Sequence, residues 1–578
     1  MKRRPAIELS RHKGTTGAGL DIGVDPDRPV LGGVGASRII SVLGRDMFGE
    51  FDAVRVPGVV AWCNFGLARE LGFSVGQRDR MTPRLHDELI HALSFRALQP
   101  GESAEASQTI RLYADKYGGG GVSPALGSAR SGFLPYGNLF LKGIGKTPLF
   151  RHKDKDDFAH SHGWLPMAEA LFEAVLGEVN NNLLSHRSTR VLAIIDQHQE
   201  IVYPDGRRRP SAIAVRSGRQ LRPGHVMAPR SGGDRSRTEI FLSITSETGQ
   251  QAICDGEPGR GRHSADLHAT MLRIVDDHAA AASELYRWRL VHGALSPSNM
   301  EIGGGMLDLA DESSQIRTAP IRLIGWDESI YGIEQIERGR QLASMYGLLL
   351  RGMSKSDRQA LNGRAFDVVS ASERAYDRNI PIRVLEAAGF RPEVAAEINR
   401  DHPDVSSRLA QTIIAMASLR NPGSINAKKA PVEKVAVLDV FNLLGTFPAE
   451  FFSAPEKDHC RAIRAALKPI HSGNHFHVAS RKAKVERLIA DFAAIYREIM
   501  FVSKPLVRRY YGDFTGMRKS VIARAAFENR PIPLICFSTL FQEANRIVAQ
   551  HRDKIDSSNF QREVDYLISA SLRNGGDL

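Results

Sequence analysis

Helical periodicity dominates the chain from about residue 265 onward. Apolar residues recur every three or four positions in the long, alanine-rich stretch 264–290, the spacing that gives a helix its apolar face. Earlier in the chain, "LPMAEALFEAVLGEVNNNLL" (165–184) has the same spacing. The pattern predicts further helices over 332–352, 485–503 and 559–574.

Two more helices are predicted near the N-terminus. "VVAWCNFGLARELGF" (59–73) is expected to be helical and to end at Gly72. "MTPRLHDELIHALSFRAL" (81–98) is expected to begin at Pro83 with Thr82 as its cap.

The stretch from about 105 to 235 has the pattern of a sheet with one prominent helix. "NLFLKGI" (138–144) is a short apolar run beside glycine-rich sequence, which is typical of a strand. Residues 189–196 and 211–217 are expected to form two strands around the turn "YPDGRRRP" (203–210).

These elements predict an α+β protein that ends in a helical C-terminal extension. We expect a flexible N-terminus, an N-terminal helical segment that packs on the core, a sheet-bearing lobe, a helical lobe and the extension, over residues 1–35, 36–104, 105–240, 241–440 and 441–578.

Composition narrows the class of protein. The chain has 578 residues, 42% of them hydrophobic, and a net charge of +12, which suits phosphate-bearing ligands, acidic partners or nucleic acid. Its four cysteines form no CxxC pair, so a zinc site or a disulfide framework is not expected. With no signal peptide and no apolar run of 18 residues in the sequence, we expect a soluble, cytoplasmic protein without a membrane partner.

"LVHGALSPSNMEIGGGMLDLADES" (290–313) has the spacing of a kinase-type catalytic loop. Such loops follow the pattern His-x-Asp-x-x-x-x-Asn and then a further Asp, and the Asn and the later Asp hold magnesium. His292, Asn299 and Asp308 match it, but Ala294 stands where the catalytic Asp is expected. The alternative is a helix end followed by a polar turn, with Asn299 as a cap.

A lysine and a glutamate could form a second part of the site. Lys142 lies on the strand that follows a glycine-rich segment, where it could neutralise nucleotide phosphates. Glu173 on the helix 165–184 could orient its ammonium group, but Glu169 and Glu178 lie on the same helix. The segment fits no P-loop, and each of these residues could instead be an ordinary solvated side chain.

Three arginines recur in "VRSGRQLRPGH" (215–225). Arg216, Arg219 and Arg222 are three residues apart, and arginine makes bidentate contacts to phosphate. The alternative is a basic surface loop. Nucleic acid ranks low as a partner, because no aromatic residues alternate with these arginines and no nucleic-acid module is found.

Taken in order, these pieces resemble one family, the SelO (selenoprotein O) protein adenylyltransferases. The resemblance covers about residues 55–350 and is carried by "LARELG", "LGSAR", "LKGIGKTP", "GWLPMAEALFEAVLGE", "AIAVRSGRQLRPGH" and "HGALSPSNM" with the later Asp308. It implies a protein-kinase-like bilobal fold. It also implies that ATP binds in a flipped orientation, so that AMP is transferred to Ser, Thr or Tyr hydroxyls of a protein or peptide (AMPylation).

The resemblance also implies roles for individual residues. Lys142 is similar to the phosphate-binding lysine and Glu173 to its partner on the helix. Gly127 and Arg130 match the nucleotide loop "LGDGR", in which Ala129 replaces the second glycine here. The two arginines that hold the inverted phosphates would be Arg216 and Arg222, and the ligands of Mg²⁺ or Mn²⁺ would be Asn299 and Asp308.

One departure from the family concerns the catalytic base. The family has an Asp directly before the metal-binding Asn, and here that position is Ser298. General base catalysis contributes about 10²–10⁴-fold, so its loss could slow transfer without abolishing it. Three hypotheses follow: a slower transferase, a transferase whose base is Asp311, Glu312 or the substrate, and a nucleotide-binding pseudokinase scaffold. A kinase-fold phosphotransferase that uses Asp327 as a metal ligand is a further alternative.

Overall fold

The computed structural model describes most of the chain. The described residues are 36–118, 127–150, 158, 162–186, 188–228, 236–249, 262–288, 292, 295–308, 328–351, 367–417, 440–467, 479–529, 537–552 and 555–572. Predictions for 1–35 and for Ala294, Asp311, Glu312 and Asp327 lie outside these residues.

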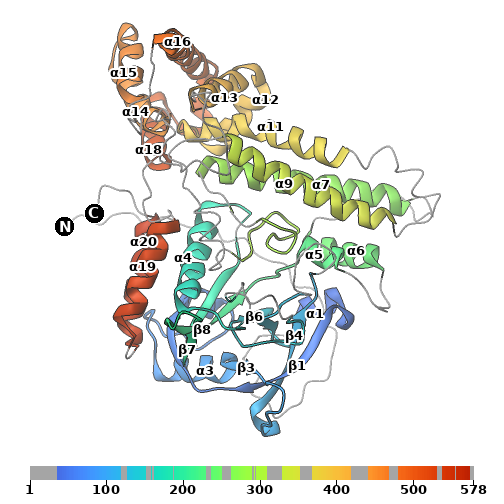
Figure 1. The fold of residues 1–578 in the computed structure, drawn as a ribbon. Coiled ribbons are helices and arrows are strands. Elements are labelled where there is room, and N and C mark those ends of the chain that lie inside the picture. Colours follow the sequence, from blue (N-terminus) through green and yellow to red (C-terminus); the bar gives the residue numbers. More distant parts are fainter. Residues whose placement is uncertain are drawn as a thin grey trace.

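An eight-stranded antiparallel sheet forms the lower part of the molecule (Figure 1). Its strand order is β2-β7-β8-β6-β5-β4-β1-β3. The strands are β1 (Phe48–Arg55), β2 (Val59–Cys63), β3 (Phe95–Ala97), β4 (Thr109–Asp115), β5 (Ser131–Phe133), β6 (Leu139–Lys142), β7 (Arg190–Val202) and β8 (Arg208–Ser217).

The two faces of the sheet are covered by different helices. Side chains alternate along a strand, and in β8 Ile213 and Val215 belong to the core that α2 (Phe65–Glu70) and α3 (Pro83–Leu93) complete. Ala212 and Ala214 face the other way, toward α4 (Met167–Leu183). Arg216 continues this second series, so the strand itself directs Arg216 to the same side of the sheet as α4.

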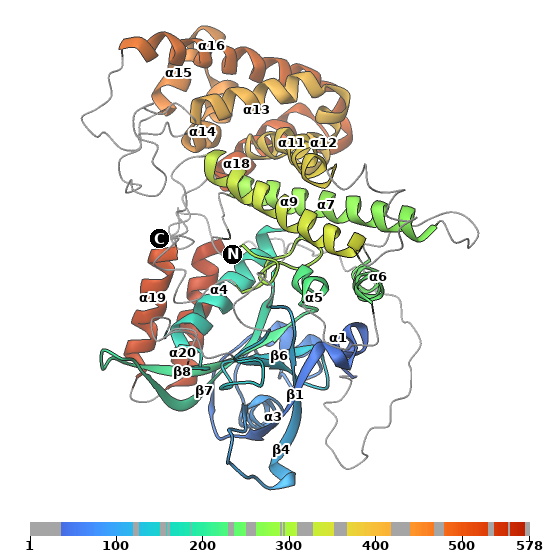
Figure 2. The same ribbon diagram turned by 45° about the vertical axis from the view of Figure 1, so that its right-hand side comes forward.

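The last two helices return to the sheet. α19 (Phe537–Gln550) and α20 (Ser557–Leu572) share a core with α4 and β2, and they lie beside α4 in Figures 1 and 2. The Trp62 indole N–H donates to Asp565 at 3.0 Å, which ties β2 to α20. The expected C-terminal extension 441–578 is therefore not a single unit. Its last two helices belong to the core on this face of the sheet, and the helices before them belong to a separate helical core.

A third core fills the space between the sheet and the central helices. It includes residues of α1 (Arg38–Leu43), α5 (Pro223–Met227), α6 (Arg237–Glu247), α7 (Arg262–Trp288) and α9 (Glu328–Arg351). α7 and α9 lie across the middle of the molecule, above the sheet (Figure 2).

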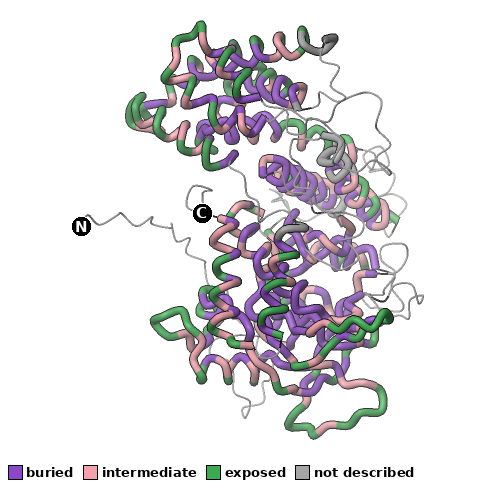
Figure 3. The backbone as a smooth tube through the Cα atoms, turned by 60° about the vertical axis from the view of Figure 1, so that its left-hand side comes forward, coloured by how far each residue is buried: buried purple, intermediate pink, exposed green. Residues whose placement is uncertain are grey.

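The upper part of the molecule is helical and has a core of its own, drawn in purple in Figure 3. Tyr286 of α7 also belongs to this core, so α7 reaches both parts. The other helices are α11 (Asp367–Ala387), α12 (Pro392–Asp401), α13 (Pro403–Ala417), α14 (Val440–Ser453), α15 (His459–Ala466), α16 (Ala479–Val502), α17 (Val507–Tyr511) and α18 (Phe514–Glu528).

Most predicted elements are confirmed. The helices expected over 165–184, 264–290, 332–352, 485–503 and 559–574 correspond to α4, α7, α9, α16 and α20, and the three expected strands to β6, β7 and β8. The helix expected over 81–98 is confirmed only over α3, because Phe95–Ala97 form strand β3. Thr82 caps α3 by accepting from Leu85 N–H at 3.1 Å. The α+β class is also confirmed.

The helix predicted over 59–73 is wrong in its first half. Residues 59–63, "VVAWC", form strand β2, which pairs with β7, and only α2 is helical. β-branched and aromatic residues favour strands, and Asn64 ends the strand by capping α2 through Leu67 N–H at 3.0 Å. The helical segment expected over 36–104 needs the same correction, because β1, β2 and β3 lie within it.

Candidate functional site

Five charged side chains from five separate elements meet beside the sheet. Lys142 and Arg216 come from the neighbouring strands β6 and β8, where Lys142 pairs with Ala214 and Phe140 with Arg216. The two cations are thus diagonal neighbours across the strand pair. We call the whole set the charged cluster: Lys142 of β6, Glu173 of α4, Arg216 of β8, Arg222 before α5, and Asp308.

Glu173 is the carboxylate at the buried end of the charged cluster. It accepts from Lys142 Nζ at 2.6 Å and from Arg216 Nη2 and Nε at 2.6 and 3.0 Å. The sequence left three glutamates of this helix open, and the other two have different partners. Glu178 binds Arg190 at 2.7 and 2.9 Å, and Glu169 lies 3.6 Å from Arg130.

Asp308 is the carboxylate at the outer end, and it receives all three cations. Its Oδ1 accepts from Lys142 Nζ at 3.1 Å and from Arg216 Nη1 at 2.7 Å, and its Oδ2 accepts from Arg222 Nη1 at 2.8 Å. The Asp308 side chain is 21% exposed, against 6% or less for the three cations. Solvent or a ligand therefore reaches the charged cluster through Asp308.

A short hairpin carries Asp308 to this place. Leu307 N–H donates to Asn299 O at 3.1 Å, so Asn299 lies opposite Leu307 and beside Asp308 in the hairpin. Ile302 N–H donates to Leu221 O at 2.8 Å, and the His278 imidazole lies 3.1 Å from Ile302 O. Burial, reinforced by Arg338, lowers the pKa of His278 to about 3, so His278 is neutral at pH 7.

Electrostatics keeps both carboxylates of the charged cluster ionised. Burial by itself would raise the pKa of Asp308, but Arg216, Lys142 and Arg222 outweigh it and hold that pKa well below its ordinary value. Burial likewise opposes ionisation of Glu173, and Arg216 and Lys142 lower its pKa. The charges of the cluster therefore stabilise one another in the absence of a ligand.

Arg219 does not belong to the charged cluster, although it shares the three-residue spacing of Arg216 and Arg222. It is exposed and donates to Glu247 O at 2.7 Å. Arg216 and Arg222 are each about 1% exposed. The spacing alone could not separate the two buried arginines from the exposed one.

A second buried network lies next to Arg222, and sequence reasoning missed it. Asp115 at the end of β4 is fully buried and lies 2.9 Å from His225 Nε2, and it also accepts from the Ser128 hydroxyl. Its Oδ2 is 3.9 Å from Arg222 Nε. The "RPGH" motif contains His225, but its partner is 110 residues away in the sequence, so no local signal could pair them.

The loop 127–130, which we call the glycine loop, packs directly on β4. Ser128 N–H donates to Asp115 O at 2.9 Å, and the Thr147 hydroxyl donates to Ser128 O at 2.6 Å. A Cβ at Gly127 would lie 2.0 Å from Asp115 O, so only glycine fits there. Arg130 donates to Trp164 O at 3.0 Å and lies 3.6 Å from Glu169, which is not a member of the charged cluster.

Ser298, the position at which the resemblance would place a catalytic base, lies next to the charged cluster. It is buried, its carbonyl accepts from Arg222 Nη1, and its hydroxyl has no hydrogen-bond partner among the described residues. The His292 ring lies 3.0 Å from Leu307 O and so supports the hairpin. Ala294 lies outside the described residues.

The residues present offer part of a magnesium site. Asp308 provides a carboxylate, and the Asn299 backbone pairs with that of Leu307, the residue before Asp308. Nucleotide sites hold Mg²⁺ with one or two carboxylates plus phosphate oxygens. Within the described ranges, no three His, Cys, Asp or Glu residues gather as metal ligands. The donor set therefore fits an ion shared with a phosphate-bearing ligand, and it does not form a complete metal cage.

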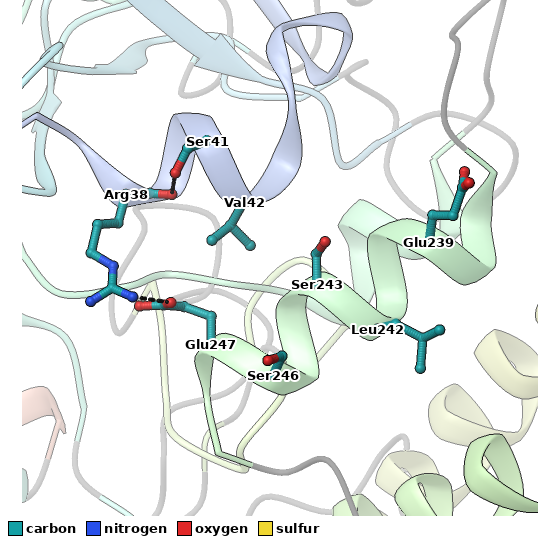
Figure 4. A pocket seen from close by; sticks show the side chains of 8 residues that line it. All are labelled: Arg38, Ser41, Val42, Glu239, Leu242, Ser243, Ser246 and Glu247. Atoms are coloured by element: carbon teal, nitrogen blue, oxygen red, sulfur yellow. Dashed lines mark hydrogen bonds and ion pairs between the residues drawn. The ribbon is translucent and has the colours of Figure 1, made fainter. Parts of the chain in front are cut away.

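A surface groove lies between α1 and α6 (Figure 4). Its volume is about 690 Å³, and Arg38 spans it to reach Glu247 at 2.8 Å. Its lining shares no residue with the charged cluster.

None of the described helices is long and apolar enough to cross a membrane.

Comparisons with known proteins identify no family. No protein-family model matches the sequence, and a search of curated proteins finds no match.

Proposed function

We propose that the chain is an ATP- and Mg²⁺-dependent nucleotidyltransferase of the SelO type, with a protein-kinase-like fold. It would transfer AMP to hydroxyl side chains of a protein or peptide. One observation carries the proposal: three buried cations, Lys142, Arg216 and Arg222, converge on the single partly exposed carboxylate of Asp308.

The charges of the cluster suit a metal–nucleotide ligand. Phosphate oxygens could replace Asp308 as acceptors for the three cations, because arginine and lysine bind phosphate with charge-assisted hydrogen bonds. The displaced Asp308 carboxylate, together with Asn299, would then hold Mg²⁺, which neutralises charge on the phosphates. Glu173 would keep Lys142 and Arg216 in place during this exchange, since it binds both from the buried side.

The reaction would be a direct displacement at the α-phosphorus. The acceptor hydroxyl oxygen forms a bond to that phosphorus, the bond to the bridging oxygen of the β-phosphate breaks, and pyrophosphate leaves. Ser298 does not supply a carboxylate base, so the hydroxyl proton passes to water or to the departing pyrophosphate. Catalysis would then depend on positioning and charge stabilisation, which predicts slow turnover.

A nucleotide-binding pseudokinase scaffold is the second candidate function. The observation that favours it is Ser298, a buried hydroxyl at the position of the family base. In this case Lys142, Arg216 and Arg222 would still bind the phosphates, and no group would be transferred.

The test is the fate of each phosphate of ATP. The full-length protein is incubated with Mg²⁺ and ATP labelled at the α- or the γ-phosphate, with its own hydroxyls as acceptors. Retained α-label that Lys142→Ala loses and Arg219→Ala keeps would support AMP transfer. Retained γ-label would contradict it and indicate kinase chemistry, and ATP binding without label would favour the scaffold.

A further inference from the structure

We infer that Asp115 and His225 form a buried positioning pair. The pair holds Arg222 and the glycine loop, two parts of the site that would bind phosphate, in fixed positions relative to each other. The inference rests on the proposed nucleotide site and assigns a role there to two residues outside the charged cluster.

The hydrogen bonds fix how His225 is protonated. The backbone N–H of Arg222 donates to His225 Nδ1 at 3.1 Å, so Nδ1 is an acceptor and the ring proton lies on Nε2. Nε2 therefore donates to Asp115 Oδ2, 2.9 Å away. Burial lowers the pKa of His225, so the imidazole stays neutral and keeps this tautomer.

Asp115 joins the two parts because each of its oxygens has a different partner. Oδ2 accepts from His225, and Oδ1 accepts from Ser128 of the glycine loop. Burial opposes ionisation of Asp115, but the hydrogen bond from the neutral His225 ring and the charge of Arg222 lower its pKa. A buried carboxylate with these partners holds each of them in one orientation, because leaving it unsatisfied would be costly.

Arg222 is confined from several sides. Its guanidinium lies over the Tyr117 ring at 4.5 Å, and Nη1 donates to Asp308 and to Ser298 O. The bond between its backbone N–H and His225 fixes the point from which the side chain extends. If His225 is removed, this backbone can move, and the guanidinium loses its alignment with the phosphates while the rest of the site stays intact.

Binding measurements on the full-length protein test the pair. Calorimetric titrations with Mg·ATP, tripolyphosphate and adenosine are compared for wild type, His225→Leu, His225→Gln and Ser128→Ala. Leucine removes both ring contacts, whereas glutamine keeps a donor for Asp115. We expect His225→Leu to weaken binding of Mg·ATP and tripolyphosphate about tenfold or more, with adenosine unchanged and His225→Gln within about threefold of wild type.

Ser128→Ala is the milder second variant, and it should also weaken tripolyphosphate more than adenosine. The inference is overturned if His225→Leu binds Mg·ATP as wild type does, or if it loses ATP and adenosine in equal proportion, because the second result indicates general damage to the fold. If wild type itself binds neither ATP nor tripolyphosphate, the proposed function fails first, and the positioning role fails with it.

Discussion

At the scale of residues, the site depends on two carboxylates with different surroundings. Glu173 is enclosed by Lys142 and Arg216, whereas Asp308 is partly exposed and binds a third cation, Arg222. Breaking a buried ion pair by removing one partner is strongly destabilising. Both carboxylates should therefore contribute to folding, and Asp308, the partly exposed one, is the carboxylate that a ligand could displace.

The low pKa of Glu173 makes its contribution to stability depend on pH. A carboxyl whose pKa is lower in the folded state stabilises the fold above its unfolded pKa, about 4.3, and loses that effect as the pH falls through the folded value. The difference in unfolding free energy between wild type and Glu173→Gln should be largest at neutral pH and should shrink below about pH 4. Chemical denaturation at several pH values measures it, and a constant difference down to pH 3 would refute the assignment.

Gly127 is required by the close approach of the loop to β4. A Cβ there would meet Asp115 O at 2.0 Å, so Gly127→Ala should push the loop away, cost about 1–3 kcal/mol in stability and weaken ATP binding. Gly76→Ala is the matched control, because a Cβ at Gly76 meets nothing within 4 Å. Equal melting temperatures and ATP affinities for the two variants would argue against this role.

The sequence could predict the members of the charged cluster but not all of their surroundings. Motif order pointed to Lys142, Arg216, Arg222 and Asp308, and the structure brings all four together. Helical spacing could not select Glu173, because three glutamates share that helix. The link between Asp115 and His225 depends on the fold of the sheet, which no local pattern encodes.

At the scale of elements, α4 is held on two sides. Glu173 points to the charged cluster, and the neighbouring Phe172 packs on Phe541 of α19 with 6.1 Å between ring centroids. Adjacent helical residues point about 100° apart, so α19 and α20 support α4 on a side other than the one that carries Glu173. The last two helices therefore have a structural part in the candidate site.

Loss of this support should be measurable. Phe560 of α20 is fully buried in the core shared with α4, so Phe560→Ala should cost about 3–5 kcal/mol and reduce ATP-dependent activity. Tyr566→Ala, on the half-exposed side of the same helix, should change little. Thermal unfolding of both variants tests this, and equal losses would mean that α20 does not support α4 through its buried side.

Local sequence signals failed where tertiary pairing decides the element. Residues 59–63 carry apolar side chains at a spacing compatible with a helix, yet they form β2 because an open edge of β7 and the surface of α20 are available to them. The helices with long periodic patterns were predictable, since their apolar faces determine how they pack.

At the scale of the whole molecule, α7 connects the site to the upper helices. Arg287 of α7 donates to Glu386 of α11 at 2.7 Å and to Glu528 of α18 at 2.9 Å. Glu284, one turn earlier on α7, accepts from the backbone N–H of Ser185 at 2.9 Å, just beyond α4. Charged groups thus join the upper helices to the segment that follows α4.

Arg287→Ala should weaken this junction, because Glu386 and Glu528 are both 5% exposed or less and would keep only Arg383 and Arg524, respectively, as partners. We expect a loss of about 2–3 kcal/mol. The control is Arg378→Ala, which removes an exposed pair with Asp276 between α11 and α7 and should cost about 1 kcal/mol or less. Urea denaturation compares the two, and similar losses would contradict the importance of the buried junction.

The return of α19 and α20 to the sheet could not be predicted from the sequence. Their periodicity shows an apolar face, but it does not say which surface that face covers. The partners, β2 and α4, lie more than 350 residues earlier, and the contacts that join them, such as Trp62 with Asp565, appear only in the fold.

The most direct test is calorimetric titration of Mg·ATP into wild type, Arg216→Ala, Arg222→Ala and Arg219→Ala. If the charged cluster binds nucleotide phosphates, the two buried-arginine variants should lose about tenfold to a hundredfold in affinity, and the exposed Arg219 variant should match wild type. Equal affinity in all four proteins, or no binding by wild type, would show that these residues do not form a nucleotide site.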